Sequence, residues 1–137
     1  MKAGLDKSGK LIALTDHFVS FGSNGKFARN ADLGPTIFPA EFVPNLEFAA
    51  SLMPLGTPTG PLRAPRNNGF TFAFQSFLDE VAAAAGRDPL EFHLDLLKER
   101  RAAVLNSVTG RASDISVEPA FDPARMRATL KLVVEQA

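Results

Sequence analysis

Residues 70–91 read FTFAFQSFLDEVAAAAGRDPLE, and this stretch decides the expected fold because it predicts a long helix followed by a sharp corner. Counted from Phe70, apolar side chains recur at offsets of four, seven, eight, eleven and fifteen, which is the buried stripe of an amphipathic helix. Gly86 then stands where a left-handed C-terminal cap is expected. The sequence therefore predicts that the first helix ends beside Gly86.

The dipeptide Asp-Pro predicts the starts of two further helices. At 88–89 and again at 122–123, the Asp offers an N-cap oxygen and the Pro suits the first helical position. Glu91 completes a capping box in the first case, and the basic residues within 98–101 suit a helix C-terminus. After residue 123, apolar positions at helical spacing predict a closing helix.

Strands are expected in the first half of the chain. Residues 3–6 and 11–21 are apolar stretches separated by a Ser-Gly turn, which predicts a β-hairpin, and 45–53 alternates as a third strand. Strands gathered early and helices late predict an α+β fold over 1–137 as a single domain. We expect a small antiparallel sheet, made of the hairpin plus at least one further strand, covered by about three helices.

Composition excludes several classes of function. Fifteen basic residues balance fifteen acidic ones, so no net field would draw the chain to nucleic acid. The chain has no Cys, which excludes disulfides and thiolate ligation of zinc or iron-sulfur clusters by this segment. No apolar run is long enough to span a membrane or to act as a signal peptide, so direct membrane insertion is not expected.

Familiar catalytic patterns are also missing. The sequence has no zinc-protease motif, P-loop, dinucleotide fingerprint or nucleophile elbow. His17 and His93 are too few to argue for a metal site, and we expect hydrogen-bonding roles for both. The acidic pairs at 79–80 and at 95 and 99 are expected to be solvated or paired with nearby Lys and Arg. We therefore predict no catalytic residue and no metal ligand in this chain.

The loop at residues 57–69 is the one candidate ligand site. Three prolines stiffen it, two glycines free its backbone, and Arg63 and Arg66 lie within it directly before the long helix. Such a loop can offer guanidinium and backbone donors to an anion. Pro-Gly loops with Arg are also often simple surface connections, and the residues alone leave that alternative open.

The order of several motifs resembles one enzyme family. The segments 59–65 (TGPLRAP), 74–82 (FQSFLDEVA) and 85–92 (AGRDPLEF) resemble the large subunits of bacterial molybdenum hydroxylases of the xanthine dehydrogenase and aldehyde oxidase family. The isoquinoline 1-oxidoreductase β-subunit branch is the most similar. Segments 5–14 and 122–126 are similar to the family's strand-turn-strand and its next helix start, so the resemblance covers nearly the whole chain as an internal segment of such a subunit.

The resemblance implies a cofactor contact in the loop. In that family an arginine of this loop lies near the molybdenum and the neighbouring backbone contacts the cofactor, which places Arg63, with Leu62 and Ala64 beside it, as cofactor-binding residues. The family often has an aromatic loop motif where this chain has Pro65, so aromatic stacking on substrate is not carried over. Gln75 also replaces a common Glu, and these departures leave the substrate open.

The parent reaction implied by the resemblance is hydroxylation of N-heterocycles or oxidation of aldehydes. The implied cofactor of the parent is molybdopterin, in its cytosine dinucleotide form, and the isolated chain is expected to bind none. The implied partners are the remainder of the large subunit, an iron-sulfur small subunit and a cytochrome electron acceptor, in a periplasmic or membrane-associated parent. The family's general-base Glu lies in a Gly-rich segment that this chain lacks, so the chain alone is expected to be inactive.

A second hypothesis belongs to a different class. A chain that begins at Met1 and carries no catalytic groups also fits a freestanding, non-catalytic binding or assembly domain derived from the same fold. A native reading frame that stops at Ala137 would favour this alternative.

Overall fold

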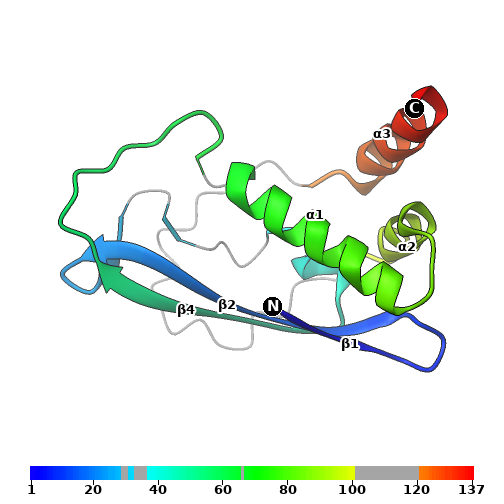
Figure 1. The fold of residues 1–137 in the computed structure, drawn as a ribbon, viewed down its shortest axis with the longest axis horizontal. Helices are drawn as coiled ribbons and strands as arrows, with labels where there is room; N and C mark the ends of the chain where they lie inside the picture. Colours follow the sequence, from blue (N-terminus) through cyan, green and yellow to red (C-terminus); the bar gives the residue numbers. More distant parts are fainter. Residues whose placement is uncertain (29–30, 33–36, 66, 101–120) are drawn as a thin grey trace.

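The chain folds into one sheet with helices on it, as the α+β prediction requires. The computed structural model describes residues 1–28, 31–32, 37–65, 67–100 and 121–137. Within these ranges the sheet has four strands, three α-helices follow mainly in the second half, and the sheet lies along one side of the molecule (Figure 1). Residues 101–120, which precede the last predicted helix, lie outside the described residues.

The N-terminal hairpin forms as predicted. Strand β1 (Lys2–Leu5) pairs antiparallel with β2 (Leu11–Ser23), and the Asp6 carboxylate accepts backbone hydrogen bonds from the intervening turn. Strand β2 continues to Ser23, two residues past the expected end, because Asn24 and Gly25 adopt positive φ in a second tight turn. That turn leads to the short antiparallel strand β3 (Lys26–Phe27).

The third predicted strand lies on the other side of β2. Strand β4 (Asn45–Pro54) pairs with β2 in parallel, from Ala13 opposite Asn45 to Gly22 opposite Pro54. The sheet is therefore mixed, and the antiparallel expectation holds only for the pairs that β2 makes with β1 and β3. A parallel neighbour needs a long connection, and residues 28–44, which include the 3-10 helix η1 (Ala40–Phe42), supply it.

The helix boundaries follow the capping residues. Helix α1 (Asn67–Ala84) begins three residues before Phe70, and Gly86 follows it with a φ of 65°, as expected of a left-handed cap. Helix α2 (Pro89–Leu96) begins where the Asp88 carboxylate accepts the Glu91 N–H at 3.0 Å. It ends at Leu96 instead of continuing into the basic residues after it.

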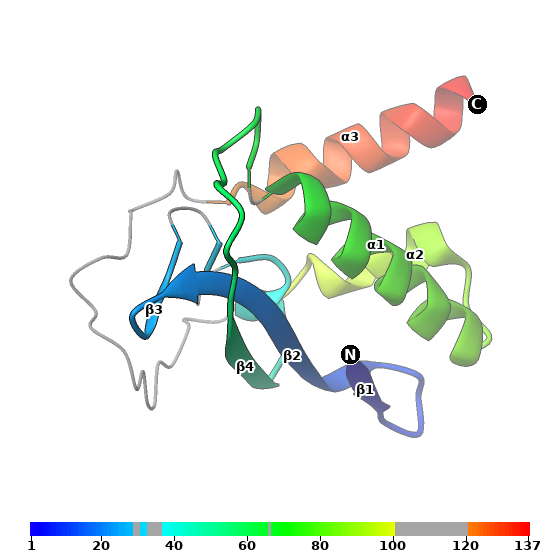
Figure 2. The same ribbon diagram turned by 60° about the vertical axis from the view of Figure 1, so that its left-hand side comes forward.

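Helix α3 (Pro123–Gln136) starts as predicted but lies apart from the core. The Asp122 carboxylate accepts the backbone N–H groups of Ala124 and Arg125, which fixes the first turn. No residue of α3 is buried, and in both ribbon views it lies farthest from the sheet (Figures 1 and 2). The Arg127 guanidinium donates to the Leu94 carbonyl at 2.9 Å and so ties α3 to α2.

The core lies where α1 packs across β2 and β4. The Phe74 ring contacts the Phe48 ring at a centroid distance of 5.8 Å, and Phe70 meets Phe18 edge-on at 4.9 Å. Burial of these side chains supplies the main stabilisation of the fold. The central cluster consists of Leu11, Leu14, Val43, Phe74, Leu78, Val81, Ala82 and Phe92.

Replacing Gly86 by Ala is expected to destabilise the chain by about 1 kcal/mol. A Cβ at this position meets nothing within 4 Å, so the cost comes from holding an L-residue in the left-handed region. Gly56→Ala is the matched control, because that site is equally open and has no positive φ. Urea denaturation followed by circular dichroism measures both variants, and equal stabilities would contradict the capping role of Gly86.

An ion-paired triad joins α2 to its flanking residues. The Asp95 carboxylate accepts hydrogen bonds from Lys98 and from Arg87, which approaches from before the helix. These two bonds, with Lys98 the larger contributor, lower the pKa of Asp95 below its ordinary value of 3.8. The ionised carboxylate therefore stabilises the folded state more than the unfolded one.

The pH dependence of stability should report this triad. Because the folded-state pKa is lowered, the contribution of Asp95 is fully present above 3.8 and is lost as the pH falls through the lowered value. Urea denaturation of wild type and Asp95→Asn at about pH 7 and at about pH 2 should show a stability difference that shrinks at the lower pH. A difference that stays constant would contradict the assignment.

Candidate functional site

The loop between β4 and α1 carries the three residues that the sequence singles out. It rises from the end of β4 and reaches the start of α1 without regular structure over residues 55–65 (Figure 2). Leu62 is 86% exposed, and Arg63 and Ala64 are also exposed. All three side chains are therefore available to a ligand or to another protein surface.

The loop closes one side of a concavity of about 300 Å³. Residues 59–65 line it, together with Asn68 at the start of α1 and Phe21 near the end of β2. Of these lining residues only Arg63 is charged, and none is a carboxylate. An anion that enters this concavity therefore meets one cation and no carboxylate of the lining.

Ala64 holds the loop in a fixed bend. Its φ is 52°, which is uncommon for a residue other than Gly, and its carbonyl accepts the Asn68 N–H at 3.1 Å. Backbone in this region persists only where the surrounding structure maintains it, and such positions gather at ligand sites. The bend turns the chain from the loop into α1 and sets the direction of the neighbouring Arg63 backbone.

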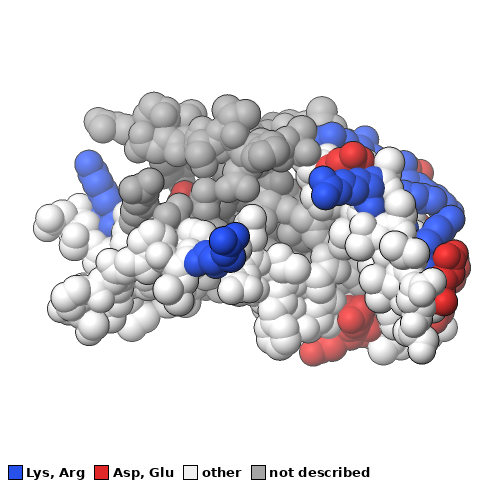
Figure 3. Space-filling view, turned by 90° about the horizontal axis from the view of Figure 1, so that it is seen from above, with Lys and Arg blue, Asp and Glu red and all other residues white. Residues whose placement is uncertain are grey.

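The guanidinium of Arg63 is not engaged by the part of the chain that the structure describes. No hydrogen bond or ion pair joins it to a described residue, whereas Arg87 and Arg100 are both paired with carboxylates. Figure 3 shows charged side chains gathered at the end that carries α2 and α3, with isolated basic side chains elsewhere on this face. Arg63 can therefore offer its donors to an external acceptor.

The two histidines form hydrogen bonds, as predicted. His17 Nε2 lies 2.7 Å from Ser51 Oγ across β2 and β4, and His93 Nε2 lies 2.9 Å from an Asp79 carboxylate oxygen between α1 and α2. His93 is buried, and its Nδ1 has no hydrogen-bond partner among the described residues. Asp95 and Glu99 both pair with cations, in agreement with the structural roles expected for the acidic pairs.

The described residues contain neither a candidate metal cluster nor a membrane-spanning helix. No group of three or more His, Asp or Glu side chains within them could hold a metal ion. No helix among them is long and apolar enough to cross a membrane.

The sequence did not indicate Phe21 as a lining residue of the concavity beside Arg63, because Phe21 belongs to a strand about forty positions away and only the fold brings it to the loop.

Comparison of the chain with protein-family models, with curated proteins and with solved structures found no match.

Proposed function

We propose that this chain is part of the molybdenum-cofactor-binding subunit of an oxidoreductase that hydroxylates N-heterocycles or oxidises aldehydes. The observation that carries the proposal is the exposed Arg63, which has no partner among the described residues and lies in a concavity whose described lining holds no carboxylate. A pterin dinucleotide is anionic, and a guanidinium recognises its phosphate oxygens through paired N–H donors. The ordered sequence motifs around the loop support the same assignment.

The residues present fit a cofactor contact of limited extent. Arg63 would bind anionic or carbonyl oxygens of the cofactor, and the backbone of Leu62 and Ala64 would supply donors and acceptors beside it. The bend at Ala64 holds this backbone in one conformation, which lowers the entropy lost on binding. When bound, the molybdenum centre supplies the oxygen-transfer and electron-transfer chemistry. The role of this chain is then to hold and orient the cofactor.

The chain alone is expected to be inactive. The described residues that line the concavity include no carboxylate or imidazole that could act as a general base. The proposal therefore assigns the base, most of the pterin-binding surface and the substrate pocket to the remainder of the large subunit. Under this proposal the partners of the large subunit would be an iron-sulfur subunit and a cytochrome electron acceptor.

Complementation tests this proposal. The remainder of the large subunit and its iron-sulfur partner are co-expressed with this chain or without it, and dye-linked oxidation of quinoline-type heterocycles and of aldehydes is measured. Activity only in the presence of the chain supports the proposal. Full activity without the chain contradicts it and favours the freestanding binding or assembly domain.

A further inference from the structure

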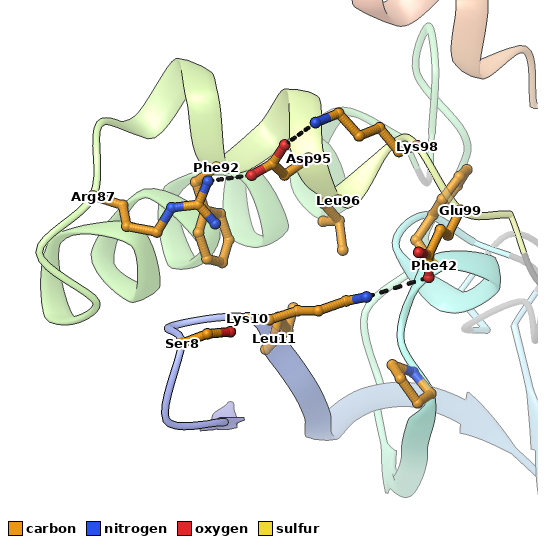
Figure 4. Close-up of a pocket in the computed structure, with 11 residues that line it drawn as sticks. Ser8, Lys10, Leu11, Phe42, Arg87, Phe92, Asp95, Leu96, Lys98 and Glu99 are labelled. Carbon is orange, nitrogen blue, oxygen red and sulfur yellow. Dashed lines mark hydrogen bonds and ion pairs between the residues drawn. The ribbon is translucent and has the colours of Figure 1, made fainter.

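A second concavity lies at the other end of β2, between α2 and the turn that joins β1 to β2. Its volume is about 450 Å³, within the range of small-molecule sites. Its apolar walls come from Leu11 on β2, Phe42 on η1, and Phe92 and Leu96 on α2. Figure 4 shows α2 and the hairpin on opposite sides of this space. It shares no lining residue with the concavity at Arg63.

The rim of this concavity carries more positive than negative charge. Lys10, Arg87 and Lys98 are basic, and only Asp95 and Glu99 are acidic. Glu99 pairs with Lys10 at 3.2 Å, whereas the single Asp95 carboxylate accepts both Arg87 and Lys98 (Figure 4). Two cations share one anion, so one positive charge on this rim is not neutralised by the other lining residues.

The cations differ in how freely they can meet a ligand. The Arg87 guanidinium lies 5.5 Å from the Phe92 ring centroid and is held there by both the ring and Asp95. The side chains of Lys10 and Lys98 are 54% and 59% exposed, and exposed lysine pairs exchange partners readily. A ligand anion can therefore recruit the two lysines while Arg87 stays fixed.

We propose that this concavity binds a small organic monoanion with an aromatic or aliphatic body. The body packs on Leu11, Phe92 and Leu96, and the carboxylate or similar group lies at the rim beside Lys98. The apolar walls favour the body by removing it from water, and the surplus cation selects one negative charge. This site is independent of the cofactor contact proposed for Arg63.

Binding of 2-naphthoate to the purified 137-residue chain tests the proposal. Calorimetry gives the Kd, and two-dimensional NMR identifies the residues whose amide signals shift. The neutral isostere 2-naphthamide is the matched ligand, because it has the same rings and lacks the charge. Lys98→Gln should raise the Kd for 2-naphthoate by roughly fivefold. Arg125→Gln on α3, outside the lining, should leave the Kd unchanged.

The location of the site and its preference for an anion can each be tested without any effect on folding. Lys98 is exposed, so its variant should keep the wild-type circular dichroism spectrum. Shifts centred on the hairpin turn and α2, with 2-naphthoate tighter than 2-naphthamide, support the site. Absence of binding, equal affinity for the two ligands, or shifts centred elsewhere overturn it. The binding measurement does not require activity of the complemented enzyme. Its outcome therefore neither supports nor contradicts the function proposed for Arg63.

Discussion

Replacement of Phe74 by Ala is expected to destabilise the chain by about 3–5 kcal/mol, the largest effect we predict for a single side chain. Phe74 is 2% exposed and packs between β4 and the remainder of α1. Its removal lowers the free energy of unfolding in two ways. The stabilisation from burying the aromatic ring is lost, and a cavity remains beside Phe48. Small domains are stable by about 5–15 kcal/mol, so the variant should lose much of its folding free energy.

Phe72→Ala provides the control for this prediction. Phe72 lies on the same helix and is 77% exposed, so the same chemical change should alter the free energy of unfolding by less than about 0.5 kcal/mol. Urea denaturation of the two variants, followed by circular dichroism, gives the comparison. A similar decrease in the free energy of unfolding for both variants would contradict the assignment of the buried face of α1.

The second large effect is expected at Arg63, in the assembled subunit. Arg63→Gln should weaken retention of the molybdenum cofactor by roughly 10-fold to 100-fold, the cost of losing a hydrogen bond to a charged group. Molybdenum retained by the purified subunit after dialysis measures the effect. Arg63→Lys keeps the charge but loses the paired donors, and should retain an intermediate amount.

Arg125→Gln is the matched control for Arg63. Arg125 lies exposed on α3 and is not among the lining residues of the concavity. The same loss of one positive charge there should leave the molybdenum content at the wild-type level. An equal decrease in both variants would indicate a general effect of charge and would contradict a specific contact at Arg63.

The features that could be predicted from the sequence are those that a local signal determines. Gly86 and the Asp-Pro pairs at 88–89 and 122–123 mark their helix ends through backbone conformation and side-chain capping, which need no tertiary information. The α+β class and the β1–β2 hairpin followed from periodicity and turn chemistry for the same reason.

Features that depend on distant contacts were not predictable. The parallel pairing of β4 with β2 is a long-range contact, and the alternation of apolar residues within 45–53 is the same for a parallel and an antiparallel strand. Likewise, Phe21 lines the concavity beside Arg63 only because β2 reaches the loop. The loop itself was identified by its prolines and arginines, but its bend at Ala64 has no sequence signature.

Measurement of molybdenum and pterin content tests the central claim most directly. The chain is purified alone, and again assembled with the rest of its large subunit and the iron-sulfur subunit. We predict stoichiometric molybdenum and pterin in the assembled protein and none in the isolated chain. Stoichiometric molybdenum in the isolated chain, or an assembled subunit that binds its full cofactor without this chain, would contradict the account.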